Sequence, residues 1–355
     1  LISSQYLVAS MASRWIECVP NISEGRDQSI IDKIVSYVST TSNVAILGCE
    51  PDPDYNRTVI TIAGEYKDVA EAAIKLIEKS TDLIDMRKHE GNHPRIGAVD
   101  VCPFVPISPD TDEDCIKASK MVIEHFSNTI PIFLYGSIAS HPSRIALSAL
   151  RKGQYEALES RFMNGEWDSE NTRMPDYWSG SWSEVEARFG AVAIGVRPVL
   201  VAYNVNVDEE TPIASKAAGS IIRTSGRLLK NNYGGKIRIN GMLSDVQGMG
   251  VPLPAHGICQ VSMNLQNYEE TPMHIAYELI KSICNDHDVS VKGSELVGLV
   301  PLAAILDAGR WYSEGDLSNE LLIKSAVSGL GLDSLEEFVP EDRIIEWAIT
   351  SKLGD

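Results

Sequence analysis

The sequence predicts an α+β protein built from two similar subdomains. Three observations lead to this class. Strand-like and helix-like segments follow the order β-α-β-β-α-β in the first half, a long irregular segment interrupts this alternation, and the alternation then restarts. The order is that of a ferredoxin-like fold, in which helices cover one face of a mainly antiparallel sheet. We therefore expect two ferredoxin-like (βαββαβ) subdomains in the 355 residues.

Short apolar runs and helical spacing define the elements of the first half. Strands are expected at residues 15–21, 43–49, 57–64 and 98–107, and helices at 27–38 and 65–84. In the second helix Val69, Ala73, Leu76 and Ile77 recur at helical spacing. A helix over 111–126, a strand over 131–135 and helical stretches to residue 162 extend this unit.

Residues 164–190 hold three of the six tryptophans and no sustained period, which is typical of a functional loop. After this loop we expect strands at 191–195, 199–207, 237–247 and 258–264, and helices at 209–229 and 272–286. Pro340, Glu341 and Asp342 are expected to open a final helix. The expected domains are an extension (residues 1–11), an N-terminal subdomain (12–188) and a C-terminal subdomain (189–355).

Composition excludes several classes of protein. A formal net charge of -18, from 31 Lys and Arg against 49 Asp and Glu, argues against a nucleic-acid binder. The longest apolar run, residues 296–306, is about half of the ~20 residues that a membrane-spanning helix needs. Six scattered cysteines and a poor signal peptide favour free thiols in the cytoplasm. Neither G-x-G-x-x-G nor a P-loop occurs, so no nucleotide cofactor is expected.

His89, Glu90 and His93 have the spacing H-E-x-x-H, which in zinc hydrolases places two imidazoles on one helical face. Gly91 and Asn92 are poor helix formers, and Pro94 disfavours a helical conformation at the residue before it. No third ligand follows at a zincin spacing. We therefore expect no metal here.

The same stretch is rich in basic residues within an acidic chain. Arg87, Lys88, His89, His93 and Arg95 fall within nine residues, just before an apolar strand. A loop with this charge suits an anionic substrate, and a histidine in it is suited to proton transfer near neutral pH. The alternative is that both histidines are surface residues without a role.

Several longer stretches resemble one known family. They are "WIECVPNISEGRD" (15–27), "NRTVITIAG" (56–64), "LIDMRKHEGNHPRIGAVDVCPFVPI" (83–107), "RKGQYEAL" (151–158), "LVAYNVNV" (200–207), "CQVSMNL" (259–265), "GSELVGLVPLAAILDA" (293–308) and "LGLDSLEEFVPEDRIIEW" (330–347). These resemble, in order, the formiminotransferase domain of glutamate formiminotransferase. The resemblance covers nearly everything after Met11.

The resemblance implies two α/β subdomains with folate in a tunnel between them, and a homodimer. It implies transfer of a formimino group from N-formimino-L-glutamate to N5 of tetrahydrofolate, which belongs to histidine degradation and one-carbon metabolism. Tetrahydrofolate is then a cosubstrate, and His93, in the family's "GNHPR" motif, is the catalytic acid or base. Fused relatives continue into a cyclodeaminase, so a separate cyclodeaminase is expected as a partner.

Other substrate contacts are expected around this histidine. Arg95 pairs either with a substrate carboxylate or with a structural partner. Asn56 and Arg57 follow an acidic turn and are expected to bind substrate, as is Glu50, where the family tends to carry Asp. Asp100 either orients the catalytic histidine or caps its strand.

Folate contacts are expected in the loop before the second subdomain. The residues are Asp176, Tyr177, Trp178, Gly180, Gly190 and Arg197. Trp178 and Trp182 either stack on the aromatic rings of folate or bury the loop against the sheet. Residues 178–188 depart from the family, which leaves the type of pterin, the polyglutamate preference and the transferred group open.

Two other functions compete with formimino transfer. A glutamate formyltransferase would use 5-formyltetrahydrofolate with the same base, because amidine and amide carbons differ only by NH in place of O. A non-catalytic folate-binding relative would keep the ligand but lose turnover. Retention of His93 and its basic neighbours favours an enzyme.

Overall fold

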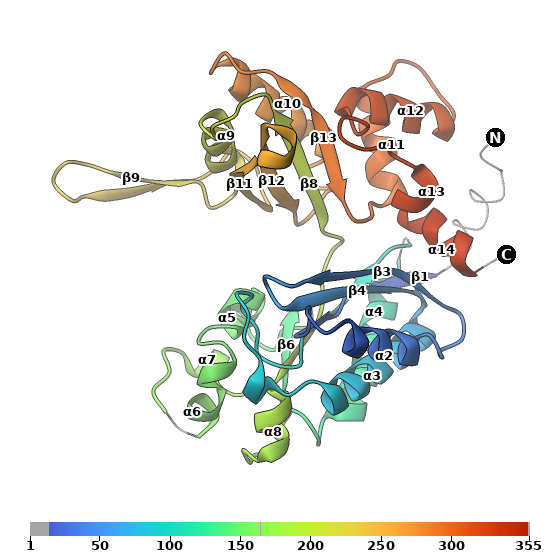
Figure 1. Ribbon diagram of the computed structural model, residues 1–355, viewed down its shortest axis with the longest axis vertical. Coiled ribbons are helices and arrows are strands. Elements are labelled where there is room, and N and C mark those ends of the chain that lie inside the picture. Colours follow the sequence, from blue (N-terminus) through green and yellow to red (C-terminus); the bar gives the residue numbers. More distant parts are fainter. Residues whose placement is uncertain (1–13, 109, 164, 354–355) are drawn as a thin grey trace. The chain divides into compact units, whose positions relative to one another are not determined.

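The computed structural model describes residues 14–108, 110–163 and 165–353, and these form two compact units (Figure 1). The N-terminal unit contains residues 14–197 together with 349–353, and the C-terminal unit contains residues 198–348. Both units mix helices with a sheet, which confirms the α+β class. No described helix is long and apolar enough to cross a membrane. The expected extension, residues 1–11, lies outside the described residues.

The seven-stranded sheet of the N-terminal unit joins antiparallel and parallel strands. Its strands are β1 (Trp15–Cys18), β2 (Asn21–Ile22), β3 (Val44–Asp52), β4 (Arg57–Glu65), β5 (Val99–Pro106), β6 (Ile132–Gly136) and β7 (Val192–Val196). β4 lies between β3 and the pair β1 and β2, which in turn pair with β5, all antiparallel. β7 then pairs in parallel with both β5 and β6.

Helices cover both faces of this sheet. They are α2 (Gln28–Val38), α3 (Tyr66–Leu83), α4 (Asp112–Phe126), α5 (Leu147–Leu150), α6 (Leu158–Phe162), α7 (Glu170–Arg173) and α8 (Glu184–Phe189), with 3-10 turns η1 (Met86–Lys88), η2 (Pro142–Arg144) and η3 (Tyr155–Ala157). Along β7, Val192 and Ile194 belong to the core under α2, α3 and α4, whereas Ala193 belongs to the core under α5 and α6. Alternate side chains of a strand point to opposite faces, so β7 is buried on both.

The boundary between the units follows from this pairing. Residue 189 was the expected start of the second subdomain, whereas the units divide after Arg197. β7 adds to the sheet of the N-terminal unit through β5 and β6, and this long-range pairing assigns it there.

The C-terminal unit repeats the order β-α-β-β-α-β around a four-stranded antiparallel sheet, β11-β12-β8-β13. Its strands are β8 (Val201–Val207), β11 (Val246–Leu253), β12 (Ile258–Leu265) and β13 (Val291–Val297), with a 3-10 turn η4 (Pro254–His256). Its helices are α9 (Ala214–Ile222), α10 (Met273–Asn285), α11 (Leu302–Trp311), α12 (Asn319–Leu330) and α13 (Pro340–Arg343), and α14 (Ile345–Leu353) ends the described chain. Pro340 opens α13, but this helix ends at Arg343, where Ile344 is extended (φ -90°, ψ 120°), and the final helix, α14, begins at Ile345 rather than at Pro340 as expected.

One predicted helix is wrong in its second half. The helix expected over 209–229 ends at Ile222, and the chain continues into β9 (Arg227–Lys230) and β10 (Lys236–Ile239). Gly226 has a φ of 57°, and a Cβ there would lie 1.9 Å from the carbonyl oxygen of Ile239. The helix has already ended where Arg223 is extended (φ -61°, ψ 139°), and the left-handed backbone of Gly226 then prevents a helix from continuing. We call residues 227–239 the arm; it projects from the sheet in Figure 1.

Candidate functional site

The loop that carries His93 begins where η1 ends and is not helical. Asp85 caps η1 by accepting a hydrogen bond from the Arg87 amide at 3.2 Å, and His89 then has extended angles (φ -80°, ψ 127°). His89 and His93 therefore do not share a helical face, and the zincin geometry is absent. Within the described residues no group of three His, Cys, Asp or Glu side chains could hold a metal ion.

Asn56 joins its own loop to two others, the loop at Gly25 and the segment that carries His93. Its buried side chain accepts a hydrogen bond from the Gly25 amide at 2.9 Å and donates one to the Glu90 carbonyl at 2.9 Å. Asn56 has a φ of 50°, a conformation that asparagine tolerates better than most residues. The backbones are so close that a Cβ on Gly91 would lie 2.4 Å from the Tyr55 carbonyl oxygen. Asn56 therefore supports the loop that carries His93.

His93 is partly buried, with its ring edge-on to Tyr55 at 6.1 Å between centroids. Partial burial, followed by the nearby charges of Arg151, Arg57 and Arg95, lowers the pKa of His93 to about 4. Each of these causes disfavours the imidazolium form. At neutral pH the ring is therefore a neutral imidazole in a cationic environment, able to accept a proton.

Arg95 is fixed by partners within its own unit. Its two terminal nitrogens contact the Glu156 carboxylate at 2.6 and 2.9 Å, and its side chain is 5% exposed. Its Nε donates to Nδ1 of His89 at 3.1 Å, so Nε2 of His89 carries the hydrogen donated to the Asn56 carbonyl at 2.9 Å. Arg95 thus forms a structural ion pair, and both ring nitrogens of His89 are already occupied.

Asp100 contacts Arg151 rather than His93. It is buried, accepts the Ile96 amide at 3.0 Å, and binds Arg151 through both carboxylate oxygens. Burial raises the pKa of Asp100, and the charge of Arg151 acts in the opposite direction. No described hydrogen bond links Asp100 to His93, so the carboxylate positions Arg151 beside the histidine. Arg151 was not among the site residues expected from the sequence, although Arg151 begins the family-like stretch "RKGQYEAL".

Arg57 and Glu50 share one face of the β3–β4 hairpin. Asp52 pairs with Arg57, and Glu50 pairs with Val59. The two pairs are two residues apart along each strand, so their four side chains lie on the same face of the sheet. Arg57 donates to the side chain of Asn21 at 3.0 Å, whereas its buried Nε has no hydrogen-bond partner among the described residues. Glu50 is exposed. A buried guanidinium donor without a partner is a candidate contact for a substrate oxygen.

The expected folate loop is tied to the N-terminal unit through Asp176. This side chain accepts from the Leu134 amide at 2.7 Å and from Arg144 at 2.6 Å, and it also contacts Ser140. Tyr177 is 40% exposed, and its backbone bridges to Ile132. The carboxylate of Asp176 is thus occupied by protein donors.

The tryptophans of the loop pack inward. The ring centroids of Trp178 and Trp182 lie 5.0 and 5.7 Å from that of Phe162, and both rings pack against the core under α5 and α6. Of the two roles considered, burial of the loop describes these contacts. Arg197 donates its backbone amide to the Phe104 carbonyl at 3.1 Å.

Gly190 ties the end of the loop to the segment after Arg95. It has a φ of 85°, and a Cβ would lie 2.3 Å from the Ile96 carbonyl oxygen. We expect Gly190→Ala to lower the free energy of unfolding by ~2 to 4 kcal/mol. The strain of an alanine at a positive φ adds to the steric overlap between its Cβ and the Ile96 carbonyl oxygen. Gly180→Ala is the matched control, since its φ is 89° but nothing lies within 4 Å of a Cβ. Urea unfolding of both variants checks this, and equal losses would contradict it.

The fold and the site define a class: two α+β units, one of which presents a neutral histidine among arginines. Two family models match this chain. The model of the formiminotransferase domain, N-terminal subdomain, matches residues 15–197, and the model of the formiminotransferase domain matches residues 202–350. The chain belongs to the formiminotransferase family.

Three relatives illustrate the similarity. The chain is 38% identical over 343 residues to formimidoyltransferase-cyclodeaminase of Rattus norvegicus, covering 95% of this chain and 60% of that protein. It is 36% identical to glutamate formimidoyltransferase of Streptococcus pyogenes serotype M1, covering 84% of this chain and 92% of the other. It is 34% identical to glutamate formimidoyltransferase of Thermoplasma acidophilum, covering 88% and 98%. The chain spans about 60% of the length of the fused relatives it matches.

Proposed function

We propose that this chain is a glutamate formimidoyltransferase, with N-formimino-L-glutamate and tetrahydrofolate as substrates in histidine degradation. Family membership and relatives named for this activity support the proposal. The observation that carries it is the state of His93, a neutral imidazole beside Arg57 and Arg151 in the loop that the family match includes. The arginines suit the carboxylates of glutamate and folate.

The chemistry needs one group that takes and returns a proton. N5 of tetrahydrofolate attacks the amidine carbon, a bond forms, and a tetrahedral intermediate results. His93 accepts the proton that N5 loses and gives it to the glutamate nitrogen, whose bond to carbon then breaks. The imidazole ends neutral, and such catalysis is commonly worth ~100 to ~10,000-fold.

The other contacts have different roles in this proposal. Arg57 offers a substrate carboxylate its Nε, for which the described residues supply no partner, and Arg151, oriented by Asp100, adds a second cation. Arg95 anchors the end of the loop that carries His93 through its two contacts with the Glu156 carboxylate. Asn56 supports the loop, and Glu50 lies on the same face of the hairpin as Arg57. Folate binding at Asp176, Tyr177, Gly180 and Arg197 remains a proposal based on the family resemblance.

An assay with two donors tests the proposal. The purified chain is offered N-formimino-L-glutamate with tetrahydrofolate, and separately glutamate with 5-formyltetrahydrofolate, and the absorbance of the pterin is followed. We expect turnover with the first pair and little with the second. Turnover with the second pair alone would identify a glutamate formyltransferase. Binding of folate without turnover would identify a non-catalytic relative.

A further inference from the structure

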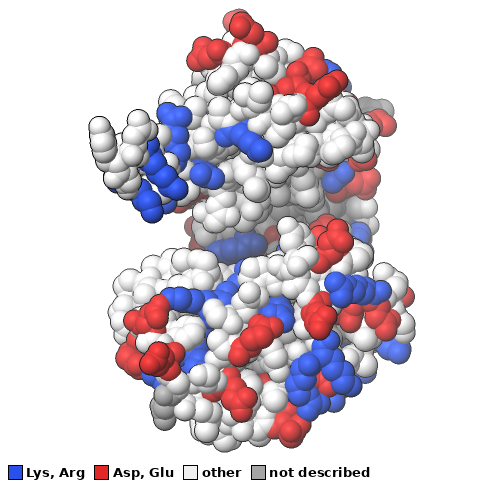
Figure 2. All heavy atoms as spheres, turned by 60° about the vertical axis from the view of Figure 1, so that its left-hand side comes forward, with Lys and Arg blue, Asp and Glu red and all other residues white. Residues whose placement is uncertain are grey.

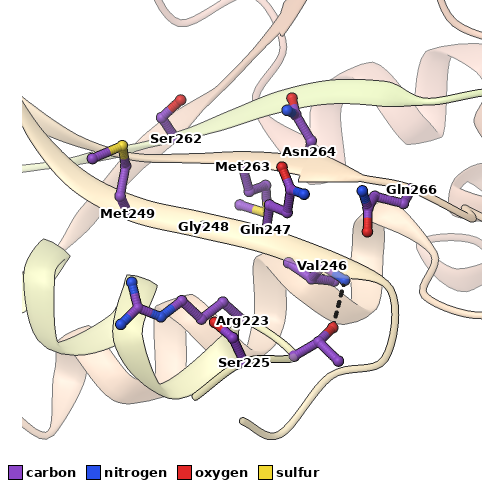
Figure 3. A pocket seen from close by; sticks show the side chains of 11 residues that line it. Arg223, Ser225, Val246, Gln247, Gly248, Met249, Ser262, Met263, Asn264 and Gln266 are labelled. Atoms are coloured by element: carbon purple, nitrogen blue, oxygen red, sulfur yellow. Dashed lines mark hydrogen bonds between the residues drawn. The ribbon is translucent and has the colours of Figure 1, made fainter. Parts of the chain in front are cut away.

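His89, the first histidine of the H-E-x-x-H spacing, takes no part in the proposed proton transfer. Two features of the C-terminal unit also lie outside the proposed site. One is the arm, on which Figure 2 shows basic side chains gathered and whose sequence has no histidine, aspartate or glutamate. The other is a cavity of about 660 Å³ between residues 223–225 and strands β11 and β12, whose described lining includes Gln247 and Asn264 but none of these three residue types (Figure 3). The loop that carries His93, in contrast, holds a second imidazole of its own.

Residues 90–94 of this loop depend on side chains for their conformation. They belong to no helix or strand, and no hydrogen bond among the described residues joins their backbone to another backbone group. A segment without such bonds is mobile unless other contacts hold it. The residues at its two ends, His89 and Arg95, supply these contacts.

His89 and Arg95 contact each other and close the segment into a loop. Nε of Arg95 donates to Nδ1 of His89 at 3.1 Å, and a terminal nitrogen of Arg95 donates to the His89 carbonyl at 3.3 Å. The two residues are six positions apart, so these bonds hold both ends of the loop together. His93 lies inside the loop, two residues before Arg95.

The other nitrogen of the His89 ring joins the loop to a neighbouring segment. Nε2 of His89 donates to the Asn56 carbonyl at 2.9 Å, and the Asn56 side chain donates to the Glu90 carbonyl at 2.9 Å. Arg95 is held in turn by its two contacts with the Glu156 carboxylate. One ring thus connects the segments at Asn56 and at Glu156 across the base of the loop.

This position needs a side chain that accepts a hydrogen bond at one atom and donates one at another. A neutral imidazole does both on a rigid ring, whereas lysine and arginine cannot accept and a carboxylate cannot donate. Partial burial is the main cause that lowers the pKa of His89, and the charge of Arg95 acts in the same direction. The ring is therefore neutral at neutral pH, as its bond from Arg95 requires. With both nitrogens occupied, the ring acts on its neighbours in the protein.

We propose that His89 is a positioning residue, which closes the base of the loop and thereby holds the His93 ring in place. This inference rests on the proposed function, because it assigns His89 a role in the reaction that His93 serves. A general base must lie within hydrogen-bond reach of the proton it moves, and a misplacement of about 1 Å costs ~100-fold in rate. Opening the loop at its base therefore slows turnover without removing a group that touches the substrate.

Two substitutions of His89 test this role. His89→Phe keeps a ring of similar size but neither accepts from Arg95 nor donates to Asn56, and we expect it to lower kcat ~10- to ~100-fold with little change in KM. His89→Gln keeps an amide that both accepts and donates, so it should recover most of the lost rate. His274→Phe is the matched control, because His274 is also buried but stacks on Trp311, outside the loop. Its kcat should equal that of the unmodified chain.

The pKa of His93 gives a readout that does not depend on turnover. Partial burial and the surrounding arginines hold this pKa at about 4, so a ring released from its position should titrate nearer to ~6.5. We expect NMR titration to show an upward shift in His89→Phe and a value close to that of the unmodified chain in His89→Gln. A loss of stability alone would leave the pKa of the folded protein unchanged. If the unmodified chain has no transferase activity, the proposed function fails, whereas this shift still decides the role of His89.

Arg95→Lys opens the same contact from its other side and covers the case in which His89→Phe does not fold. Lysine keeps the positive charge but has no donor at the position of Nε. We expect the pKa of His93 to rise and kcat to fall, as in His89→Phe. An unchanged pKa of His93 in either folded variant would overturn the proposal, as would a His89→Gln variant that turns over no faster than His89→Phe.

Discussion

His93→Asn is expected to lower kcat at least ~100-fold while tetrahydrofolate still binds. Asparagine keeps a polar side chain of similar size but cannot accept and return a proton near neutral pH. The arginines that surround the ring keep their own partners, Arg95 with Glu156 and Arg151 with Asp100. Substrate binding should therefore change far less than turnover. Steady-state kinetics and a fluorescence titration with tetrahydrofolate measure the two effects separately.

The matched control is His125→Asn, on α4. His125 is exposed on α4 and contacts Glu78 on α3 at 3.0 Å, outside the loop that carries His93. Its kinetics should equal those of the unmodified chain. If His93→Asn keeps kcat within a few-fold, the imidazole does not carry the proton, and the proposed mechanism fails.

The low pKa of His93 also fixes the shape of the pH profile. A base with a pKa of about 4 is deprotonated throughout the neutral range, so kcat/KM should be flat there and fall only as the pH approaches that value. An ordinary histidine would produce the acid limb near pH ~6.5 instead. Because the folded pKa is depressed, the unfolded chain binds more protons below pH ~6.5, and acidification through this range also lowers stability. NMR titration of the His93 ring checks the assignment directly.

Asn56→Ala is expected to lower both stability and turnover. The substitution leaves the Gly25 amide and the Glu90 carbonyl without their partner and places alanine at a φ of 50°. A loss of ~2 to 4 kcal/mol in the free energy of unfolding follows. The loop that carries His93 then shifts, and a misplacement of about 1 Å costs ~100-fold in rate. Urea unfolding and kcat/KM measure the two losses.

Asn43→Ala separates the backbone strain from the hydrogen bonds. Asn43 has a φ of 56°, close to that of Asn56, but it is exposed and precedes β3, outside the loop that carries His93. We expect this control to lose only the ~1 to 2 kcal/mol of a left-handed alanine and to keep full activity. Equal effects of the two substitutions would show that Asn56 has no special role in supporting the loop.

Local sequence patterns correctly predicted the amphipathic helices, in which one side is buried and the other is exposed. α2 and α3 follow the expected ranges, because Ile31, Ile34 and Val38 in α2 recur at the spacing that buries one side of a helix. The same reasoning failed between Arg223 and Leu229. Two adjacent leucines there fit a helix as well as a strand, and pairing with β10 decides for the strand.

In the candidate site, the sequence indicated the candidate proton-transfer group, His93, and the tertiary structure determined its surroundings. The histidine of "GNHPR", the lack of a helix at H-E-x-x-H and the family follow from neighbouring residues and from their order along the chain. The pairs Asp100 with Arg151 and Arg95 with Glu156 join residues 51 and 61 positions apart. Such contacts depend on which loops the sheet brings together, and no local pattern encodes that. They set the charge around His93, and so its protonation state, only once the chain has folded.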